Sequence, residues 1–515
     1  MLLRTSIIEG RYLDSVLLMS LAAQLKSRDG VADASAMMGT DANKAVLRET
    51  KMLDALGEAA GPSDLIVAIM VEDEALAAEV FATLPALLEP PKQARGTSTA
   101  ELAARTLDEA KQRLPEASLV VISIPGVFVK HEALRALDLG LHPFIFSDNV
   151  SVEDEIELKT IGRERGLLVM GPDCGTSILN GMAIGFANVV SRGAVGIVGA
   201  SGTGIQELSC LLDHAGVGVH QAIGVGGRDL SQRVGGLSMR QGIALLAADP
   251  KVSVLALVSK PPHPEVARQV LLEAKACGKP VMVCFLGGDP KIAQELGLHF
   301  APRLDFAAQI CTALVRGEPV PTQPDSLSSE YLEKASELAH KMPSGRKLIR
   351  ALYSGGTLCD EAIQVADKLG LEGVRSNLAS EGPHALSEPG KSEGNCFLDL
   401  GDDYFTRGRP HPMIDFASRR ERIAVEAAQP DCAVILLDVV LGYGSHADPA
   451  GELVAAISAL PEGGPVLVAS ITGTHADPQN YGQQRARLQA AGVHVLPNNA
   501  SAAAFATAIV KELLA

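Results

Sequence analysis

The chain has 515 residues, enough for about three or four domains, and 47% of them are hydrophobic, an ordinary content for a globular enzyme. The net charge of −16 and the lack of any Lys/Arg block argue against nucleic acid or a membrane surface as a partner. The eight cysteines are scattered without a CxxC pair, which argues against zinc fingers and a disulfide framework. We therefore expect reduced thiols in a cytoplasmic protein with no metal site.

The first 115 residues show an α/β pattern with few landmarks. The segment Ser15–Lys26 predicts a buried helix rather than a signal peptide, because charged residues precede it and no clear cleavage site follows. No apolar run reaches membrane-spanning length. The other expected elements are strands at Thr5–Glu9, Val31–Met38 and Leu65–Met70, a helix at Glu74–Leu88, and a surface excursion at Pro90–Thr99.

From Ser118 onward, strands and helices alternate clearly, which predicts a doubly wound parallel sheet. Strands are expected at Leu119–Ile124, Pro143–Ser147 and Leu167–Met170, with Lys130–Leu139 and a segment capped by Ser151 as helices. Ligands of such sheets bind beyond the carboxyl ends of the strands. We therefore predict Asn149 and Cys174, which follow two of these strands, as substrate-binding residues. Cys174 is either a nucleophile or a plain loop thiol, and no His or Lys lies beside it to lower its pKa.

The segment Gly193–Leu208, GAVGIVGASGTGIQEL, is the most informative stretch of the chain. Its β-branched residues predict a buried strand, and apolar residues at helical spacing follow a small-residue turn. A helix N-terminus at such a turn presents free N–H groups and a partial positive charge to an anion. The predicted anion-binding residues are Ser201, Gly202, Thr203 and Gly204, with Glu207 one turn further as a catalytic candidate. The alternative is a tight strand-to-helix connection capped by Ser201 or Thr203.

The pattern of that unit then repeats. Strands at His220–Val225, Val252–Val258 and Pro280–Leu286 complete the first copy, and a linker is expected at 317–345. The second copy has expected strands at Leu348–Tyr353, Cys396–Leu400, Cys432–Val440 and Pro465–Ile471. Its strand-end loops come in the same order as those of the first copy, which predicts two flavodoxin-like units. The second copy adds six predicted anion-binding residues: Ser354, Gly355, Gly356, Thr357, Gly442 and Gly444.

A dense polar cluster, Gly401–Asp415 (GDDYFTRGRPHPMID), follows a strand of the second copy. Arg407 and Arg409 are predicted to clamp a substrate carboxylate or phosphate, and His411 to act as an acid or base. Arg228 stands in the matching loop of the first copy and is predicted to bind substrate as well. The alternative is a solvated surface loop.

Several of these segments together resemble the succinyl-CoA synthetase superfamily. IPGVFVKH, FSDNVSVED and VMGPDCGT resemble the end of the α-subunit's CoA-binding domain, and GIVGASGTGIQEL resembles the entry to its phosphate-binding helix. CFLDLGDD and LLDVVLGYG resemble the last domain of the β-subunit. Nearly the whole chain is similar to FdrA-type acyl-CoA synthetase-like proteins, through MMGTDANKA, GVGGRDLS, RGRPHPMID and the segments above. By motif position, Glu207 matches the family glutamate that contacts a phosphorylated histidine.

The resemblance implies a Rossmann-like CoA-binding-type domain with an extra N-terminal segment (1–190), followed by two synthetase-like flavodoxin-type domains (191–316 and 346–515) joined by the linker 317–345. Two departures matter. The Gly-His-Ala-Gly setting of the phosphorylated histidine is missing, although His299 is nearby, and neither the ATP-grasp domain nor the CoA-binding glycine loop is recognisable. We therefore expect no phosphohistidine to form in this chain.

The resemblance leaves three functions open. Some FdrA-type proteins are linked to a multi-subunit oxamate carbamoyltransferase of purine breakdown, which converts oxalurate and phosphate to oxamate and carbamoyl phosphate. Alternatively, the chain is an acyl-CoA ligase subunit whose partner supplies the nucleotide site, or a non-enzymatic regulator that binds CoA or a metabolite. The expected ligands are phosphate or carbamoyl phosphate and a small carboxylate, with CoA left open. Other subunits are the expected partners, and a homodimer is left open.

Overall fold

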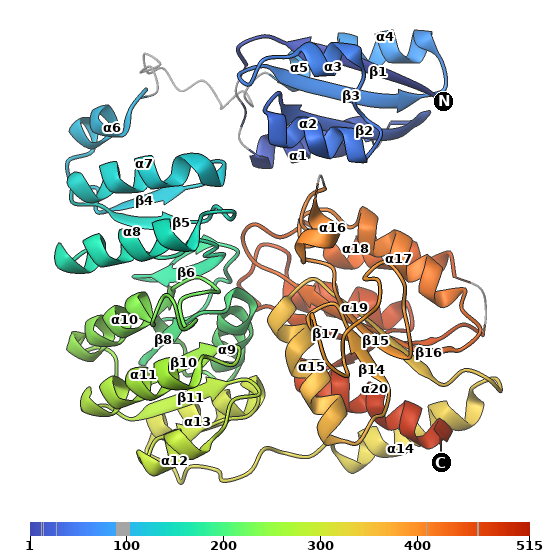
Figure 1. The fold of residues 1–515 in the computed structure, drawn as a ribbon. Helices are drawn as coiled ribbons and strands as arrows, with labels where there is room; N and C mark the ends of the chain where they lie inside the picture. Colours follow the sequence, from blue (N-terminus) through green and yellow to red (C-terminus); the bar gives the residue numbers. More distant parts are fainter. Residues whose placement is uncertain are drawn as a thin grey trace. The chain divides into compact units, whose positions relative to one another are not determined.

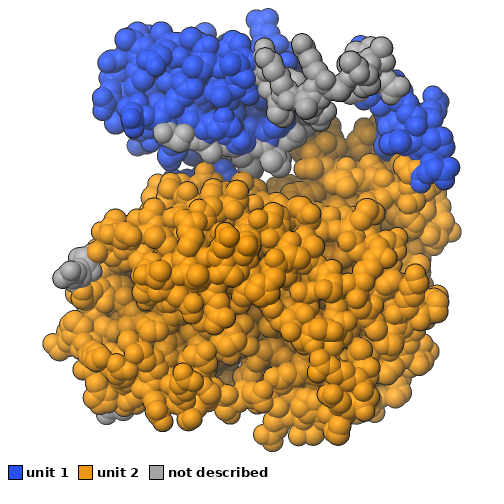
Figure 2. All heavy atoms as spheres, turned by 180° about the vertical axis from the view of Figure 1, so that it is seen from behind, with its two compact units in different colours: residues 1–116, 405–410 blue, residues 117–404, 411–515 orange. Residues whose placement is uncertain are grey.

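The computed structural model describes residues 1–11, 13, 15–26, 28–88, 104–407, 409–460 and 463–514. The chain divides into two compact units (Figure 2). Unit 1 comprises Met1–Glu116 with Phe405–Pro410, and unit 2 comprises Ala117–Tyr404 with His411–Ala515. No helix in the described ranges is long and apolar enough to cross a membrane.

Unit 1 contains an antiparallel sheet with the strand order β1-β3-β2. The central strand has the sequence LIVAIMV and is almost wholly buried, as expected of a strand with a neighbour on both sides. The strands are β1 (Leu2–Ile8), β2 (Val31–Met38) and β3 (Leu65–Val71). The helices are α1 (Ser15–Lys26), α2 (Asp41–Glu49), α3 (Ala55–Ala59), α4 (Glu74–Ala82), α5 (Leu84–Leu87) and α6 (Leu107–Arg113).

Two expectations for unit 1 need comment. The single helix expected at Glu74–Leu88 is divided at Thr83, because Pro85 favours a new helix start and cannot donate to the preceding turn. The surface excursion expected at Pro90–Thr99 lies outside the described residues.

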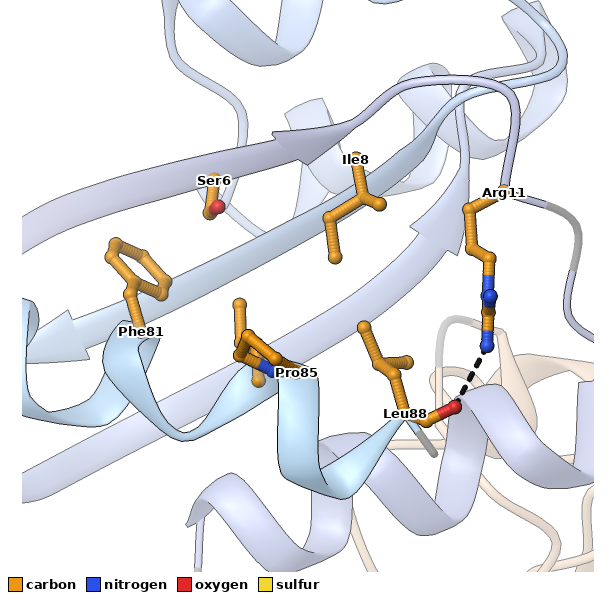
Figure 3. A pocket seen from close by; sticks show the side chains of 7 residues that line it. Ser6, Ile8, Arg11, Phe81, Pro85 and Leu88 are labelled. Atoms are coloured by element: carbon orange, nitrogen blue, oxygen red, sulfur yellow. Dashed lines mark hydrogen bonds between the residues drawn. The ribbon is translucent and has the colours of Figure 1, made fainter. Parts of the chain in front are cut away.

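A pocket of about 480 Å³ lies between β1 and the α4–α5 segment of unit 1 (Figure 3). Its walls are mainly apolar, and its one charged side chain, Arg11, donates a hydrogen bond to the Leu88 carbonyl at 2.7 Å. The lining residues are Ser6, Ile8, Arg11, Phe81, Leu84, Pro85 and Leu88. The pocket therefore packs like the edge of a small core and offers little polar chemistry.

Unit 2 begins with two parallel strands, β4 (Leu119–Ile122) and β5 (His142–Ile145), and the helices α7 (Gly126–Asp138) and α8 (Val152–Glu164). Ser151 caps α8 as predicted, accepting a hydrogen bond from the Asp154 amide at 3.1 Å. The strand expected at Leu167–Met170 is reduced to an isolated bridge between Met170 and Phe144.

The first half of unit 2, residues 176–316, is built on a sheet with the order β12-β11-β10-β8-β9-β6-β7 (Figure 1). Its strands are β6 (Thr176–Leu179), β7 (Met182–Gly185), β8 (Val195–Gly199), β9 (Val219–Gly224), β10 (Val254–Ser259), β11 (Val281–Phe285) and β12 (His299–Phe300). Its helices are α9 (Gly202–His214), α10 (Leu237–Ala248), α11 (Pro264–Ala276), α12 (Lys291–Glu295) and α13 (Leu304–Arg316). The domain boundary expected at residue 190 falls between β7 and β8, inside this sheet, because the hairpin β6–β7 joins it through β9.

The second half, residues 329–514, has a sheet with the order β14-β15-β13-β16-β17-β18. Its strands are β13 (Leu348–Tyr353), β14 (Val374–Ser376), β15 (Asn395–Asp399), β16 (Cys432–Val440), β17 (Val466–Thr472) and β18 (His494–Leu496). Its helices are α14 (Ser329–Lys341), α15 (Gly356–Lys368), α16 (Asp403–Thr406), α17 (Ala417–Ala427), α18 (Pro449–Ser458), α19 (Tyr481–Ala490) and α20 (Asn499–Leu514). The expected linker 317–345 therefore contains a helix, α14, which Ser328 caps and which packs against α20.

One hydrophobic cluster runs through both halves. It includes Ile205 and Leu208 of α9, Phe306 of α13, and Leu358 and Ala362 of α15, all buried. Figure 1 shows α9 and α15 on the facing sides of the two halves, and the two helices contact each other. The mixed α/β architecture with parallel sheets confirms the predicted fold class.

Candidate functional site

The N-termini of α9 and α15 meet where the two halves pack together. The hydroxyl groups of Ser201 and Thr357 lie 2.6 Å apart, and both side chains are buried. A Cβ atom on Gly355 would lie only 2.8 Å from Thr203 Cγ2, so this approach requires glycine. The structure thus brings the two predicted anion turns together at one place. It also places the positive ends of two helix dipoles side by side, an arrangement that negative charge stabilises.

The N-terminus of α15 receives that negative charge from Asp438 of β16. The Asp438 carboxylate accepts hydrogen bonds from the Ser354 amide at 2.9 Å and the Gly355 amide at 2.8 Å. It is buried and forms an ion pair with Arg419 at 3.0 Å. Burial raises the pKa of Asp438, and the Arg419 guanidinium opposes this rise. The Ser354 and Gly355 amides, predicted to bind an external anion, are therefore occupied by the chain's own carboxylate.

The N-terminus of α9 has no such carboxylate. Val198 pairs with Leu257 in the first sheet and Leu352 with Leu437 in the second, so Val258 stands where Asp438 stands in the second copy. The Gly204 amide donates to the Ser201 hydroxyl at 3.0 Å, which confirms Ser201 as the N-cap. Within the part of the chain that the structure describes, the Gly202 and Thr203 amides have no acceptor. The matching Gly356 and Thr357 amides of α15 have no acceptor there either, so the two turns differ in the carboxylate that lies at Ser354 and Gly355. We call the α9 turn, which has no such carboxylate, the open turn.

The buried glutamates Glu207 of α9 and Glu361 of α15 lie behind these turns at matching positions. Glu207 accepts hydrogen bonds from the Thr472 hydroxyl and the Asn499 amide of the second half, and Glu361 accepts one from the Leu304 amide of the first half at 2.7 Å. The Asn499 side chain also donates to Glu361, at 2.8 Å. Burial raises the pKa of Glu207 to about 7 and that of Glu361 to about 8. Since both Glu207 oxygens are engaged inside the interface, its predicted catalytic role stays a prediction.

His411 lies beside the end of β15. A Cβ atom on Gly401 would lie 2.7 Å from His411 Nε2 and 3.1 Å from Asp399 Oδ1. The His411 ring packs near Phe186 of the first half, with 5.7 Å between ring centroids. His411 Nδ1 accepts a hydrogen bond from the Met413 amide at 3.3 Å, which places the proton of a neutral ring on Nε2. Burial lowers the pKa of His411 to about 4, so the ring is a neutral donor at pH 7.

This low pKa predicts how stability depends on pH. The unfolded chain binds a proton at His411 near pH 6.5 and the folded chain only near pH 4, so the stabilisation is present above pH 6.5 and lost as the pH falls toward 4. We expect His411→Gln to reduce the acid-dependent loss of melting temperature. In NMR, the His411 ring should not titrate between pH 7 and 5, and a midpoint near 6.5 would contradict the burial argument.

Gly442 and Gly444 have structural tasks. The Gly442 amide donates to Gln479 Oε1 at 3.0 Å, so it is not free for an anion. The φ angle of Gly442 is +103°, and a Cβ atom there would lie 2.5 Å from the Ala187 carbonyl oxygen. A Cβ atom on Gly444 would lie 2.8 Å from Cδ1 of the Phe186 ring. The prediction of Gly442 as an anion-binding residue is therefore corrected, because its amide is occupied. That of Gly444 stays a prediction, and both glycines allow the two halves to approach.

Three predicted substrate-binding residues lie around the β4–β5 part of unit 2. Arg228 forms an ion pair with the buried Glu155 at 3.0 Å and donates a hydrogen bond to the Val150 carbonyl at 2.8 Å. These two contacts stabilise the start of α8. Asn149 is exposed at a turn with φ +53°.

Cys174 is buried, and burial raises the pKa of its thiol to about 12. A protonated, buried thiol is neither a nucleophile nor a ligand contact, which corrects that prediction.

Arg407 and Arg409 have exposed side chains. They belong to the segment Phe405–Pro410, which groups with unit 1. Their role as a carboxylate clamp stays a prediction.

Sequence reasoning missed four charged residues of this region: Lys260, Glu361, Asp399 and Asp438. Asp438 is the only acid in the buried strand CAVILLDVV, which is a usable signal. Glu361 could have been found by aligning Gly356-Thr357 with Gly202-Thr203, which sets Glu361 against Glu207. Lys260 and Asp399 come together only through the packing of the halves.

Comparisons with known proteins agree with this architecture. Residues 352–509 match the CoA-ligase family. Residues 190–287 match the CoA binding domain family, whereas a domain of that type was expected in the preceding segment, residues 1–190. Residues 1–104 match "AllF, heavy metal-associated domain". That segment contains no Cys or His, so it offers neither a thiolate nor an imidazole ligand to a metal ion. No group of three or more potential metal ligands occurs among the described residues.

The relatives cover the chain to different extents. YahF of Escherichia coli, whose name gives no function, is 42% identical over 94% of this chain and 93% of its own. The ADP-forming sulfoacetate-CoA ligase subunit SauD of Bilophila wadsworthia is 27% identical over 33% of this chain and 60% of its own. The succinate–CoA ligase α-subunit of Aquifex aeolicus is 27% identical over 33% and 57%, respectively. The chain therefore belongs, with YahF, to the FdrA-type acyl-CoA synthetase-like proteins of the succinyl-CoA synthetase superfamily.

Proposed function

We propose that this chain is an enzyme subunit that binds the phosphate of an acyl or carbamoyl phosphate at the Gly202–Thr203 turn. The observation that carries the proposal is the contrast between the two helix N-termini: the Asp438 carboxylate lies at that of α15, and Val258 stands at the matching position beside α9. An open helix N-terminus in a buried interface stabilises charge that develops during transfer.

The reaction that suits an anion site without a nucleotide motif is phosphorolysis of a carbamoyl group. A phosphate oxygen attacks the terminal carbamoyl carbon of oxalurate and forms a C–O bond. The bond from that carbon to the oxamyl nitrogen breaks, and this nitrogen takes up a proton to leave as oxamate. No ATP is consumed, which agrees with the lack of a recognisable ATP-grasp segment in the sequence. In this proposal the chain is one subunit of an oxamate carbamoyltransferase.

A second candidate, an acyl-CoA ligase subunit that uses a partner's nucleotide site, is favoured by the CoA-ligase and CoA-binding matches. The assay that separates the two candidates combines the purified chain with the subunits that co-purify with it. Carbamoyl phosphate formed from oxalurate and phosphate without ATP or CoA supports the first function. Product that requires ATP and CoA supports the second, and saturable CoA binding without turnover in either assay leaves a regulator.

Gly202→Val is expected to abolish anion binding at the open turn. Its side chain would fill the approach to the amides, since even a Cβ atom lies 3.1 Å from Thr176 Oγ1. Phosphate or carbamoyl phosphate should raise the melting temperature of the wild type and not that of the variant.

The matched control is Gly227→Val in the loop after β9, where the nearest atom to a Cβ is 3.6 Å away. This variant should respond to phosphate as the wild type does. Equal thermal shifts in Gly202→Val and the wild type would show that the turn has only a structural role.

A further inference from the structure

The pocket of unit 1 is bounded on one side by an apolar face of the α4–α5 segment (Figure 3). Four of its lining residues stand at the spacing i, i+3, i+4 and i+7, which places them on one face of a helical segment: Phe81, Leu84, Pro85 and Leu88. In the described ranges β1 is the edge strand of its sheet, so it covers only part of this face. Phe81 and Leu88 consequently stay half-buried beside the pocket.

Strand β1 forms the opposite wall. Successive side chains of a strand point to opposite faces of the sheet. Ile8 therefore packs with the core on the α4–α5 side, whereas Ile7 packs with the core on the other side. Ser6 shares the face of Ile8, and its hydroxyl group forms no hydrogen bond with the described residues. The pocket volume of about 480 Å³ lies within the range of small-molecule sites, about 300–1,000 Å³.

Arg11 brings a positive charge to this pocket. Its Nη2 atom donates a hydrogen bond to the Leu88 carbonyl oxygen at 2.7 Å, which holds the guanidinium beside the apolar walls. No carboxylate of the described residues forms an ion pair with Arg11, whereas Arg4 of β1 is paired with Glu74. Figure 3 shows Arg11 at one end of the pocket and Ser6 at the other. The remaining N–H donors of Arg11 offer the planar fork that suits a carboxylate.

We infer that the pocket of unit 1 binds a small carboxylate with an apolar body. Its carboxylate group lies on Arg11, and its hydrocarbon part lies between β1 and the α4–α5 segment. A neutral hydrocarbon would leave the charge of Arg11 unpaired, and a small hydrated anion such as phosphate would leave the apolar walls uncovered. The inference uses residues of unit 1 alone, so it does not depend on the proposed anion turn of unit 2.

Titration of the intact chain with octanoate, followed by NMR of labelled isoleucine and leucine methyl groups, tests the inference. The Ile8 and Leu84 signals should shift until saturation, and those of Ile205 and Leu208 of α9 should not. Arg11→Met should weaken octanoate binding by about 5-fold, the upper end for an ion pair that is open to solvent. Arg11→Lys, which keeps the charge, should weaken it less.

The probes separate the charge of the ligand from its apolar body. 1-Octanol, which has the same length and no charge, should bind to the wild type and to Arg11→Met equally. Acetate, which has the charge and almost no apolar body, should shift no methyl signal of unit 1. Ser6→Phe should abolish octanoate binding, because the ring fills the pocket from a strand position that suits an aromatic residue.

Arg48→Met is the matched control, because Arg48 is an exposed arginine of α2, whose Leu47 packs on the other face of the sheet. It should bind octanoate as the wild type does, and so should Gly202→Val. Equal octanoate affinity in the wild type and Arg11→Met would overturn the assignment of a carboxylate. Octanoate that leaves the Ile8 and Leu84 signals unchanged, or that binds Ser6→Phe as tightly as the wild type, would overturn the site itself. Failure of phosphate to bind the wild type would remove the proposed function and leave this inference standing.

Discussion

Asp438→Ala is expected to lower the free energy of unfolding by about 3–5 kcal/mol, the cost of leaving a buried charge without its partner. Arg419 is 1% exposed in its side chain and has Asp438 as its ion-pair partner at 3.0 Å. The substitution also leaves the Ser354 and Gly355 amides of the α15 N-terminus without acceptors. The urea unfolding midpoint should fall clearly, and Asp438→Asn, which keeps one acceptor oxygen, should cost less.

The control for this prediction is the neighbouring arginine. Arg420→Ala removes an ion pair with Glu452 whose side chains are 45% and 29% exposed, so it should cost less than about 1 kcal/mol. If both variants unfold at the same urea concentration, Asp438 does not hold the second helix N-terminus in the way described.

The second large effect is a loss of stability at alkaline pH caused by Glu207 and Glu361. Their folded pKa values of about 7 and about 8 lie above the usual value of 4.5, so the folded chain holds protons that the unfolded chain releases. The stabilisation is complete below about pH 4.5 and is lost as the pH rises through 7 and 8. Each unit of pKa difference is about 1.4 kcal/mol, so each of the two glutamates contributes a loss of the order of a few kcal/mol.

Variants isolate this contribution from other titrating groups. Glu361→Gln should flatten the fall in stability between pH 5 and 9, because the amide cannot ionise. Glu333→Gln, at an exposed site of α14, should leave the profile unchanged. An unaltered profile in Glu361→Gln would mean that Glu361 is already charged in the folded protein.

Much of the fold was predictable because local signals decide it. The β-branched strand Val195–Gly199 and the small-residue turn after it fixed the start of α9, and Ser201 acts as its cap. The helix Ser15–Lys26 was predicted with its observed bounds. The helix α14 was missed because the three prolines of RGEPVPTQPD favoured a linker, although Ser328 supplies a cap signal. The place of the β6–β7 hairpin in the sheet of the first half of unit 2 depends on long-range pairing, which has no local signature.

The candidate site was only partly predictable. The two turns could be recognised separately, since each combines small residues with a helix start. Their meeting through Ser201 and Thr357 depends on how the halves pack. The bonds from the Ser354 and Gly355 amides to Asp438 depend on the pairing of β13 with β16, which are far apart in the sequence. Cys174 shows the converse, because its position after a strand suggested a ligand contact while tertiary packing buries it.

The most direct test of the central claim is a crystal structure of the intact chain soaked in phosphate, refined against data from crystals with and without the anion. We expect one tetrahedral peak within hydrogen-bond distance of the Gly202 and Thr203 amides. The Ser354 and Gly355 amides should keep their bonds to Asp438. A phosphate at the Ser354–Gly355 turn, or an empty Gly202–Thr203 turn in a crystal saturated with phosphate, would contradict the account.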